Sequence, residues 1–379
     1  MFALFILTNK KIQIMRTKLS LTVIAIFLIL MGCTNDKENT QNTNGFVFTM
    51  SNALSGNELI QYKINTDGSL SLVATLATTG LGTGTNLSSQ GSVILSADKK
   101  FVFVVNAGDN SLSSFLMLPT GVMTFVGKYN LQGIRPISIT QRGNLVYVLC
   151  NEGATGVSSF EGFVLSSSGV LTAIPNSKQT FPIDVNPAQI SFVHNNVLVV
   201  SERATNQLSS YNLDPTTNIS ISSQNITTSH VYPYGFAVNS LGQIFVTEAS
   251  ASSSVSSYLV SQTGELNVIS TLSNTQAGAC WAAINSTSTI CYSSNAGANT
   301  ISSFEISSTG TLTTTQTAID LGAGNSPLDI GISSNDKYLY VLAGTSDKIL
   351  PFKVEGTALS PIDCEPIYVP GAAYGLAVY

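Results

Sequence analysis

A unit of about 48 residues recurs along most of the chain, and this repeat limits the fold more than any other feature. Each copy has an apolar run, a polar turn, an alternating run such as FVFVV, a small polar loop and a further run that contains an aromatic residue. Residues 91–124 show the full order. The aromatic residues that mark the register, spaced 45 to 53 residues apart, are Tyr62, Phe115, Phe160, Tyr211, Tyr258, Phe304 and Phe352. Seven such residues predict seven units.

Each unit contains four short runs with period-two alternation, separated by turn residues, which is typical of a four-stranded antiparallel meander. A meander of this size cannot bury both of its faces alone, so it has to stack on neighbouring units. Closing the stack into a ring removes the exposed ends of a linear array. The sequence therefore predicts an all-β fold, a seven-bladed β-propeller.

The two ends of the repeat region test ring closure independently. The first copy begins with GFVFTMSN, which matches the second strand of a unit and has no first strand before it. The chain ends with AYGLAVY, which matches the first strand PYGFAV of another unit. We therefore expect one blade to be shared between residues 373–379 and residues 45 to about 80, within a propeller domain that covers residues 45–379.

The N-terminal segment has the pattern of a targeting signal. Arg16 and Lys18 precede an apolar run at residues 19–30, which is short for a membrane span. Met15 gives a more ordinary signal-peptide start, so residues 1–14 could be a misassigned extension. A plain transmembrane anchor is the alternative interpretation. We expect residues 1–32 to be a signal peptide.

The signal ends in Leu-Met-Gly-Cys, which resembles the bacterial lipobox, and Cys33 is its candidate for lipidation. The residues that follow, 33–44, are polar and predict a tether with nothing to bury. The resemblance implies a protein of the bacterial cell envelope that meets the membrane only through its N-terminal lipid.

Charge excludes one class of partner. The chain has 16 basic and 21 acidic residues, and four of the basic ones precede residue 33, so the remainder carries 12 against 21, or −9. Nucleic-acid binding normally depends on clustered Lys and Arg. We therefore expect no nucleic-acid partner.

Cysteines and known motifs give no sign of a metal or a cofactor. Beyond Cys33 the chain has Cys150, Cys280, Cys291 and Cys364, without CxxC spacing and with two His residues to complete a set. A disulfide is one option, and isolated buried thiols are the preferred one. The chain contains no GxSxG, HExxH or GxxxxGK motif. We predict no metal and no cofactor.

The repeat assigns residues to two faces of the ring. Tight turns such as Thr120-Gly121 and Ser168-Gly169 lie on one face, where glycine supplies a positive φ, and we interpret them as structural. His194 is on a turn of the same face, and we expect it to be solvated. Connections between blades and the loops after second strands lie on the opposite face.

That opposite face collects the chemically versatile side chains. Since inner strands crowd the axis, these groups are expected to ring one concave mouth of the channel, the default place for a ligand. The predicted catalytic residues are Glu202, Arg203 and His230. The predicted ligand-binding residues are Arg135, Glu152, Gln189, Glu248, Trp281 and Asp329.

Segments such as FVFVVNAGDNSLSSF and ACWAAINSTSTICYSSNAGANTISSF are similar to the lactonase-like seven-bladed propeller family, which includes 6-phosphogluconolactonases and carboxymuconate lactonising enzymes. The resemblance implies an active site with a Glu at the end of a second strand, matched here by Asn151-Glu152 and Ser201-Glu202. It also implies a His after Pro at the start of an inner strand. The seven positions equivalent to that His hold Ser92, Ser138, Gln189, Gly235, Trp281, Asp329 and Gly375.

Two functions are compatible with these residues. The preferred one is a monomeric envelope module that binds a small carboxylate or lactone ligand, or an envelope protein, through the loop face without catalysis. The alternative is an enzyme that opens or closes lactones, with Glu202 as acid or base, Arg203 and Arg135 orienting a carboxylate, and His230 assisting.

Overall fold

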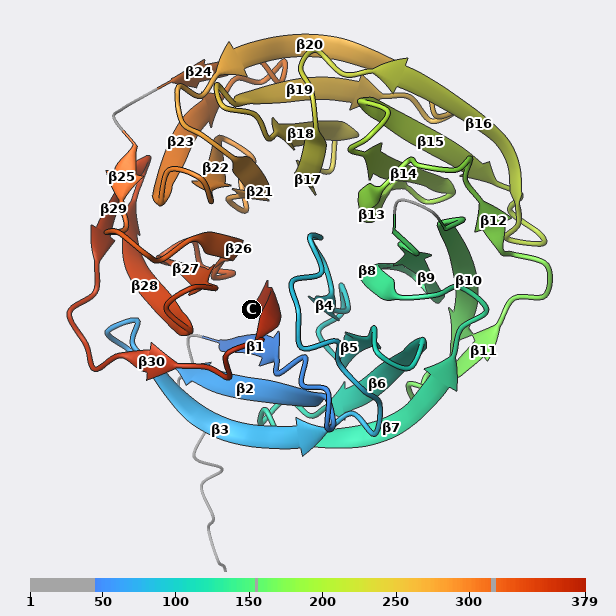
Figure 1. Ribbon diagram of the computed structural model, residues 1–379, viewed down its shortest axis with the longest axis horizontal. Helices are drawn as coiled ribbons and strands as arrows, with labels where there is room; N and C mark the ends of the chain where they lie inside the picture. The colour runs from blue at the N-terminus through green and yellow to red at the C-terminus, as the bar shows by residue number, and fades with distance from the viewer. Residues whose placement is uncertain (1–44, 154–155, 315–317) are drawn as a thin grey trace, which may run out of the picture. The chain divides into compact units, whose positions relative to one another are not determined.

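The computed structural model describes residues 45–153, 156–314 and 318–379, and all the regular elements in them are β-strands. The strands form seven antiparallel sheets that surround a central axis as blades (Figure 1). The predicted seven-bladed β-propeller is confirmed. Within the described ranges, no helix is long and apolar enough to cross a membrane. The predicted signal peptide, the tether and Cys33 lie outside the described residues.

Blades are numbered here along the chain, and the strands of each blade run from the axis to the rim. Blade 1 contains β31 (Tyr374–Val378), β1 (Phe46–Met50), β2 (Glu58–Ile64) and β3 (Leu70–Ala77). Blade 2 contains β4 (Val93–Leu95), β5 (Phe101–Asn106), β6 (Ser111–Met117) and β7 (Met123–Asn130). Blade 4 contains β13 (Pro187–His194), β14 (Val197–Glu202), β15 (Gln207–Leu213) and β16 (Ser220–Thr227). Blade 5 contains β17 (Pro233–Val238), β18 (Gln243–Glu248), β19 (Ser254–Val260) and β20 (Leu266–Ser273).

The other three blades have a fifth short strand, because the outer strand is interrupted and a second piece pairs with the third strand. Blade 3 contains β8 (Pro136–Arg142), β9 (Leu145–Cys150), β10 (Ser159–Leu165), β11 (Leu171–Ala173) and β12 (Gln179–Thr180). Blade 6 contains β21 (Ala279–Ile284), β22 (Ile290–Asn295), β23 (Thr300–Ile306), β24 (Leu312–Thr314) and β25 (Ile319–Asp320). Blade 7 contains β26 (Pro327–Ile332), β27 (Tyr338–Ala343), β28 (Lys348–Glu355), β29 (Ala358–Pro361) and β30 (Ile367–Tyr368).

Blade 1 closes the ring as the sequence predicted. The C-terminal strand β31 pairs antiparallel with β1, with Val47 opposite Val378 and Phe48 opposite Ala377. The Phe46 N–H donates to the Tyr379 carbonyl at 3.1 Å. The two ends of the repeat region therefore share one sheet, and β1 is not left as the inner edge of blade 1.

Aromatic side chains bind neighbouring blades together. All seven register aromatics are buried, with exposed fractions of 0 to 7%. The Phe160 and Tyr211 rings of blades 3 and 4 meet edge to face, with centroids 4.9 Å apart. Such pairs add about 0.5–1.5 kcal/mol beyond the area they bury. The repeated aromatic thus marks the surface on which one blade packs against the next.

The predicted tight turns also join the blades. Gly121 has φ +86°, and a methyl group there would collide with the Phe46 ring. Its carbonyl accepts a hydrogen bond from Gln61 Nε2 of blade 1 at 2.8 Å, and the Gly169 carbonyl accepts one from Ser114 Oγ of blade 2 at 2.9 Å. These glycines are structural, as predicted.

His194 is not solvated, which corrects the expectation for it. It is 9% exposed and lies between blades 4 and 5, with Nε2 2.7 Å from the Val260 carbonyl and Nδ1 3.0 Å from Gln262 Nε2. The turn position alone did not reveal this packing, because the contacting residues, at the end of β19 and in the turn after it, lie 66 and 68 residues further along the chain.

The four described cysteines are free thiols, and Cys150, Cys280 and Cys291 are buried. Burial raises the pKa of the Cys280 and Cys291 thiols to about 12. Such thiols stay protonated and unreactive at neutral pH.

Candidate functional site

The loop face is the side of the ring that carries the connections between blades, and the connection from β3 to β4 crosses the channel there. Figure 1 shows this segment reaching the middle of the ring. We call residues 80–91 the plug. Ser89 in the plug bonds three blades: its Oγ donates to the Ile137 carbonyl at 2.8 Å, its N–H to Tyr374 Oη at 3.0 Å, and its carbonyl accepts from Trp281 Nε1 at 2.9 Å. The chain itself therefore crosses the mouth that the sequence predicted to be concave.

Gln90 extends the plug across the ring to blade 6. Its Nε2 donates to the Ala282 carbonyl at 2.8 Å, and its Oε1 accepts from the Ala282 N–H at 3.2 Å. Gly235 lies beside this contact, and a methyl group there would collide with Gln90 Oε1. The absence of a side chain at Gly235, one of the seven positions equivalent to the family His, makes room for the plug.

Arg203 is held rigidly beside the plug. Its Nη2 donates to Asn186 Oδ1 at 2.7 Å, its Nε to the Asn186 carbonyl at 3.2 Å, and its Nη1 to Tyr234 Oη at 3.2 Å. The guanidinium carbon lies 4.8 Å from the centre of the Tyr234 ring, which is within the range of a cation–π contact. Arg203 is 8% exposed, so its charge is largely removed from water.

Arg135 supplies a second guanidinium in the same region. Its Nη2 donates to the Asn86 carbonyl of the plug at 3.1 Å, and its backbone adopts φ +59°, fixed by a bond from its N–H to Asn110 Oδ1 at 2.8 Å. Burial lowers the pKa of Arg135, and the charge of Arg203 lowers it further. The charge of Arg203 therefore acts on the Arg135 guanidinium.

Among the described residues, no carboxylate lies within 4.0 Å of either guanidinium. The ion pairs found there are formed by other side chains. Two like charges that are partly buried without a counter-charge oppose folding. Two such groups favour an anion nearby, because guanidinium groups recognise carboxylates with paired N–H donors. We call Arg135 and Arg203 the arginine pair.

Glu202 does not point to the arginine pair. Its Oε1 accepts from Ser209 Oγ at 2.6 Å and its Oε2 from Thr205 Oγ1 at 2.9 Å. It is 4% exposed, and burial raises its pKa, opposed by those two hydroxyl bonds. The carboxylate ties the end of β14 to β15 and the loop before it.

Glu248 has the same role in blade 5. Its oxygens accept from Ser254 Oγ at 2.6 Å, Ser256 Oγ at 2.7 Å and Tyr258 Oη at 3.2 Å, and its exposed fraction is 0%. His230 lies next to it, with Nδ1 3.7 Å from Glu248 Oε2 and its backbone N–H 3.3 Å from Oε1. His230 is therefore a neighbour of Glu248 and not of Glu202.

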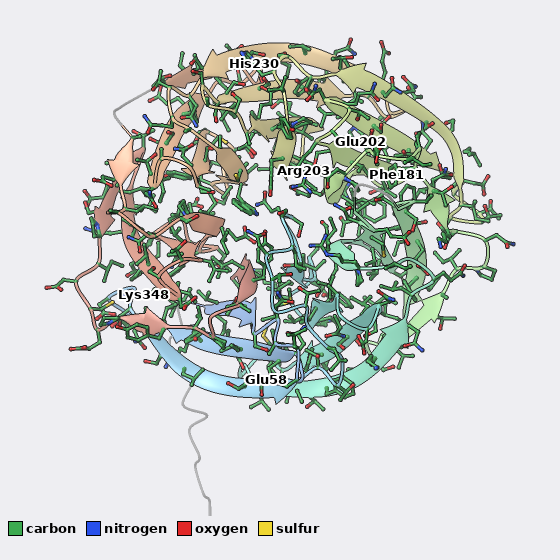
Figure 2. The ribbon with its side chains drawn as sticks, in the orientation of Figure 1. Glu58, Phe181, Glu202, Arg203, His230 and Lys348 are labelled. Atoms are coloured by element: carbon green, nitrogen blue, oxygen red, sulfur yellow. The ribbon has the colours of Figure 1, made fainter. Side chains whose placement is uncertain are left out.

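These contacts separate the predicted catalytic residues. Figure 2 shows the labelled Arg203 near the axis and His230 at the rim. Glu202, Arg203 and His230 each have different partners, so the structure does not gather them around one substrate position. Their catalytic roles therefore stay predictions, because the three side chains share no set of contacts.

The predicted ligand-binding residues on inner strands are engaged with neighbouring blades. Gln189 Nε2 donates to the Phe236 carbonyl at 2.9 Å, and its Oε1 accepts from the Phe236 N–H at 2.6 Å. Asp329 Oδ2 accepts from the Leu376 N–H at 3.0 Å, and Trp281 is 1% exposed. These groups join inner strands and are not presented to a ligand at the loop face. Glu152 differs, since it is exposed and accepts from the Val157 N–H at 3.1 Å.

Sequence reasoning missed three contributors to the site, namely Asn86, Asn186 and Tyr234. Tyr234 follows Pro233 at the start of an inner strand, so its position was detectable from the repeat. The asparagines lie in connections without periodicity, and Asn86 contacts Arg135 from a different connection, 49 residues away along the chain.

The fold and these contacts define a seven-bladed propeller with a plugged channel and an arginine pair on its loop face. The family model for "Lactonase, 7-bladed beta-propeller" matches residues 44–179, 165–282 and 264–371. The chain belongs to this lactonase propeller family. No curated protein matches its sequence.

Solved structures agree with the fold. A Bacteroides fragilis protein with a provisional 6-phosphogluconolactonase name is 19% identical, with TM-score 0.70 over 89% of this chain and 98% of that one. The periplasmic gluconolactonase of Pseudomonas aeruginosa is 14% identical, with TM-score 0.68 over 87% and 98%. A Lactobacillus plantarum protein is 16% identical, with TM-score 0.71 over 87% and 98%. At these identities the likeness concerns the fold alone.

Proposed function

We propose that the protein is a cell-envelope lipoprotein whose lactonase-like propeller binds a small carboxylate-bearing ligand through its loop face without catalysis. The observation that carries the proposal is the arginine pair, two electrostatically coupled cations without a carboxylate partner among the described side chains. The carboxylates that could serve as acid or base, Glu202 and Glu248, are bound by hydroxyl donors of their own blades.

The first test measures binding and turnover by the full chain in detergent. Isothermal titration with gluconate and with cis,cis-muconate should give binding that Arg203→Ala weakens by about tenfold or more, since a hydrogen bond to a charged group contributes about 1.5–3 kcal/mol. Arg142→Ala is the matched control, because it removes the same charge at the far end of β8 and should leave binding unchanged. Absence of carboxylate binding would contradict the proposal.

Family membership supports a second candidate, a lactone-opening or lactonising enzyme. The same preparation should show no turnover on a panel of sugar and muconate lactones. Hydrolysis that Glu202→Gln abolishes would establish the enzyme and reject the binding module.

The cellular address has its own test. We expect the full chain, expressed in a bacterial host, to incorporate an alkyne-labelled fatty acid and to fractionate with membranes. Cys33→Ser should abolish the label and release the protein from the membrane fraction. Cys364→Ser replaces a partly exposed thiol of the propeller and should change neither the label nor the fractionation. A label that persists in Cys33→Ser would place the lipid elsewhere.

A further inference from the structure

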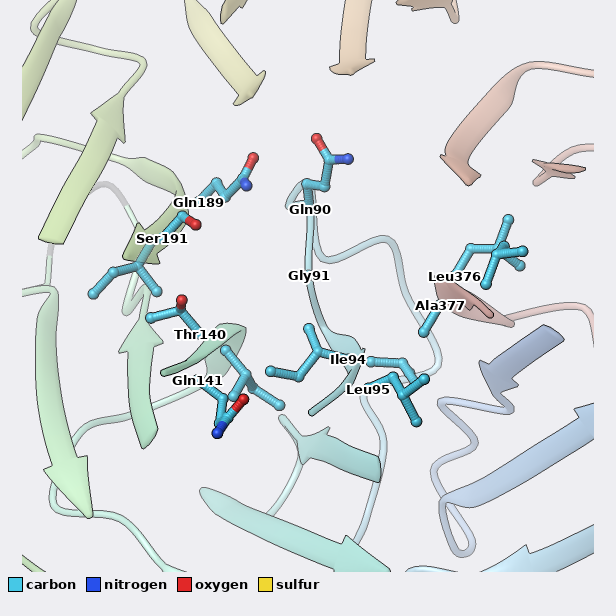
Figure 3. Close-up of a pocket in the computed structure, with 14 residues that line it drawn as sticks. Gln90, Gly91, Ile94, Leu95, Thr140, Gln141, Gln189, Ser191, Leu376 and Ala377 are labelled. Carbon is cyan, nitrogen blue, oxygen red and sulfur yellow. The ribbon is translucent and has the colours of Figure 1, made fainter. Parts of the chain in front are cut away.

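A cavity of about 350 Å³ lies inside the channel, along the inner strands β4, β8, β13 and β31 (Figure 3). Its lining runs from Gln90 and Gln189, near the starts of these strands, to Leu95 and Gln141 at their ends. The strand ends meet the turns on the face opposite the loop face. The plug therefore lies between this cavity and the loop-face mouth.

Two primary amides form the plug end of the cavity. Gln90 is fixed by both bonds to Ala282, and Gln189 by both bonds to Phe236. Figure 3 shows the Gln90 amide pointing away from Ile94 and Leu95. A primary amide has two N–H donors and two lone pairs, and the observed bonds use one of each. Each amide therefore retains a donor and an acceptor in a fixed orientation.

The accessible walls of the cavity are more polar than apolar, and alkyl side chains contribute the apolar part. Ile94, Leu95 and Leu376 contribute alkyl surface, and the Thr140 hydroxyl accepts from the Phe192 N–H at 2.9 Å, which leaves its proton to donate. No lining side chain carries a charge. An ion would lose its hydration there without a partner, whereas a neutral polar group would find donors and acceptors at the plug end.

We propose that this cavity is a second ligand site, distinct from the arginine pair, which binds a small uncharged molecule with a carbonyl or amide group at one end and an apolar body. The volume is at the lower end of the range for small-molecule pockets. The amides of Gln90 and Gln189 bind the polar end, and Ile94, Leu95 and Leu376 contact the body. The two sites thus differ in the charge they accept.

The experiment uses two probes of one shape, cyclohexanecarboxamide and cyclohexanecarboxylate, with the full chain in detergent. Ligand-observed NMR should show the amide bound to the wild-type protein. Ile94→Trp and Ser191→Leu, which fill the cavity from β4 and β13, should each weaken amide binding by about tenfold or more. Circular dichroism and the melting temperature verify that each variant is folded, and two variants keep the test decisive if one fails to fold.

Arg203→Ala is the control that separates the two sites. It should leave amide binding unchanged and remove any binding of the carboxylate. Amide binding that survives both filling variants, or that Arg203→Ala abolishes, would overturn the second site. Absence of carboxylate binding with retained amide binding would reject the proposed function and leave this inference standing.

Discussion

Trp281→Ala should lower the free energy of unfolding by about 3–5 kcal/mol, the usual effect of truncating a buried large aromatic side chain. Trp281 is 1% exposed, its ring packs on Tyr234 with centroids 5.3 Å apart, and its indole N–H bonds the Ser89 carbonyl of the plug. The substitution leaves a cavity in blade 6 and an unpaired carbonyl in the plug. Denaturant unfolding followed by circular dichroism measures the change.

Trp281→Phe separates packing from the plug contact. It keeps an aromatic ring but removes the N–H, so the expected loss is smaller, about 1–3 kcal/mol for a buried acceptor left unsatisfied. Hydrogen exchange should increase in residues 80–91 and stay unchanged in β9 and β27. If exchange in the plug does not increase in either variant, the indole does not hold the plug.

The ring and its closure were predictable because each blade repeats the same local pattern. Period-two alternation fixes which side chains face the neighbouring blades, and the register aromatics such as Phe115 and Phe304 are fully buried as that pattern requires. The match between residues 373–379 and other inner strands located the partner of β1 correctly.

The plug was not predictable in this way. Its sequence, GLGTGTNLSSQG, is rich in glycine and polar residues and has no period, so it resembles an ordinary surface connection. Its position depends on bonds from Ser89 and Gln90 to residues 192 positions away. Contacts at such separations are not encoded in local pattern, and they hold the plug across the mouth of the channel.

The roles of Glu202 and Glu248 were missed for a different reason, since the signal was present in the repeat. The last residue of the second strand is bonded to hydroxyl groups of the following segment in four blades. These sets are Asn106 with Ser111 and Ser113, Glu202 with Thr205 and Ser209, Glu248 with Ser254 and Ser256, and Asn295 with Thr300 and Ser302. Either Asn or Glu occupies this structural position in these four blades, so the carboxylates are variants of a hairpin contact. A comparison among the repeats would have favoured a structural role.

Asp329→Asn should flatten the dependence of stability on pH between about 4 and about 8. Burial raises the pKa of the Asp329 carboxyl to about 8, opposed by bonds from the Ile330 and Leu376 N–H groups. In the unfolded chain the carboxyl ionises near its ordinary pKa of 3.8. Within this window the folded protein retains a proton that the unfolded chain has lost, so the free energy of unfolding falls as the pH rises.

The limiting slope from one such group is about 1.4 kcal/mol per pH unit, and it ends above pH 8, where both states are ionised. Melting temperatures of the full chain from pH 4 to pH 9 measure it. The pKa values of Glu161 and Glu202 are also raised by burial, so they contribute slope of the same sign and the variant should reduce the slope without abolishing it.

Asp214→Asn is the matched control, because hydrogen bonds lower the pKa of that exposed carboxyl and it titrates below the window. Equal slopes in Asp329→Asn and the wild-type protein would show that Asp329 is ionised in the folded ring. In that case the Asp329 carboxylate, between blades 7 and 1, is a buried charge that the N–H groups of Ile330 and Leu376 stabilise.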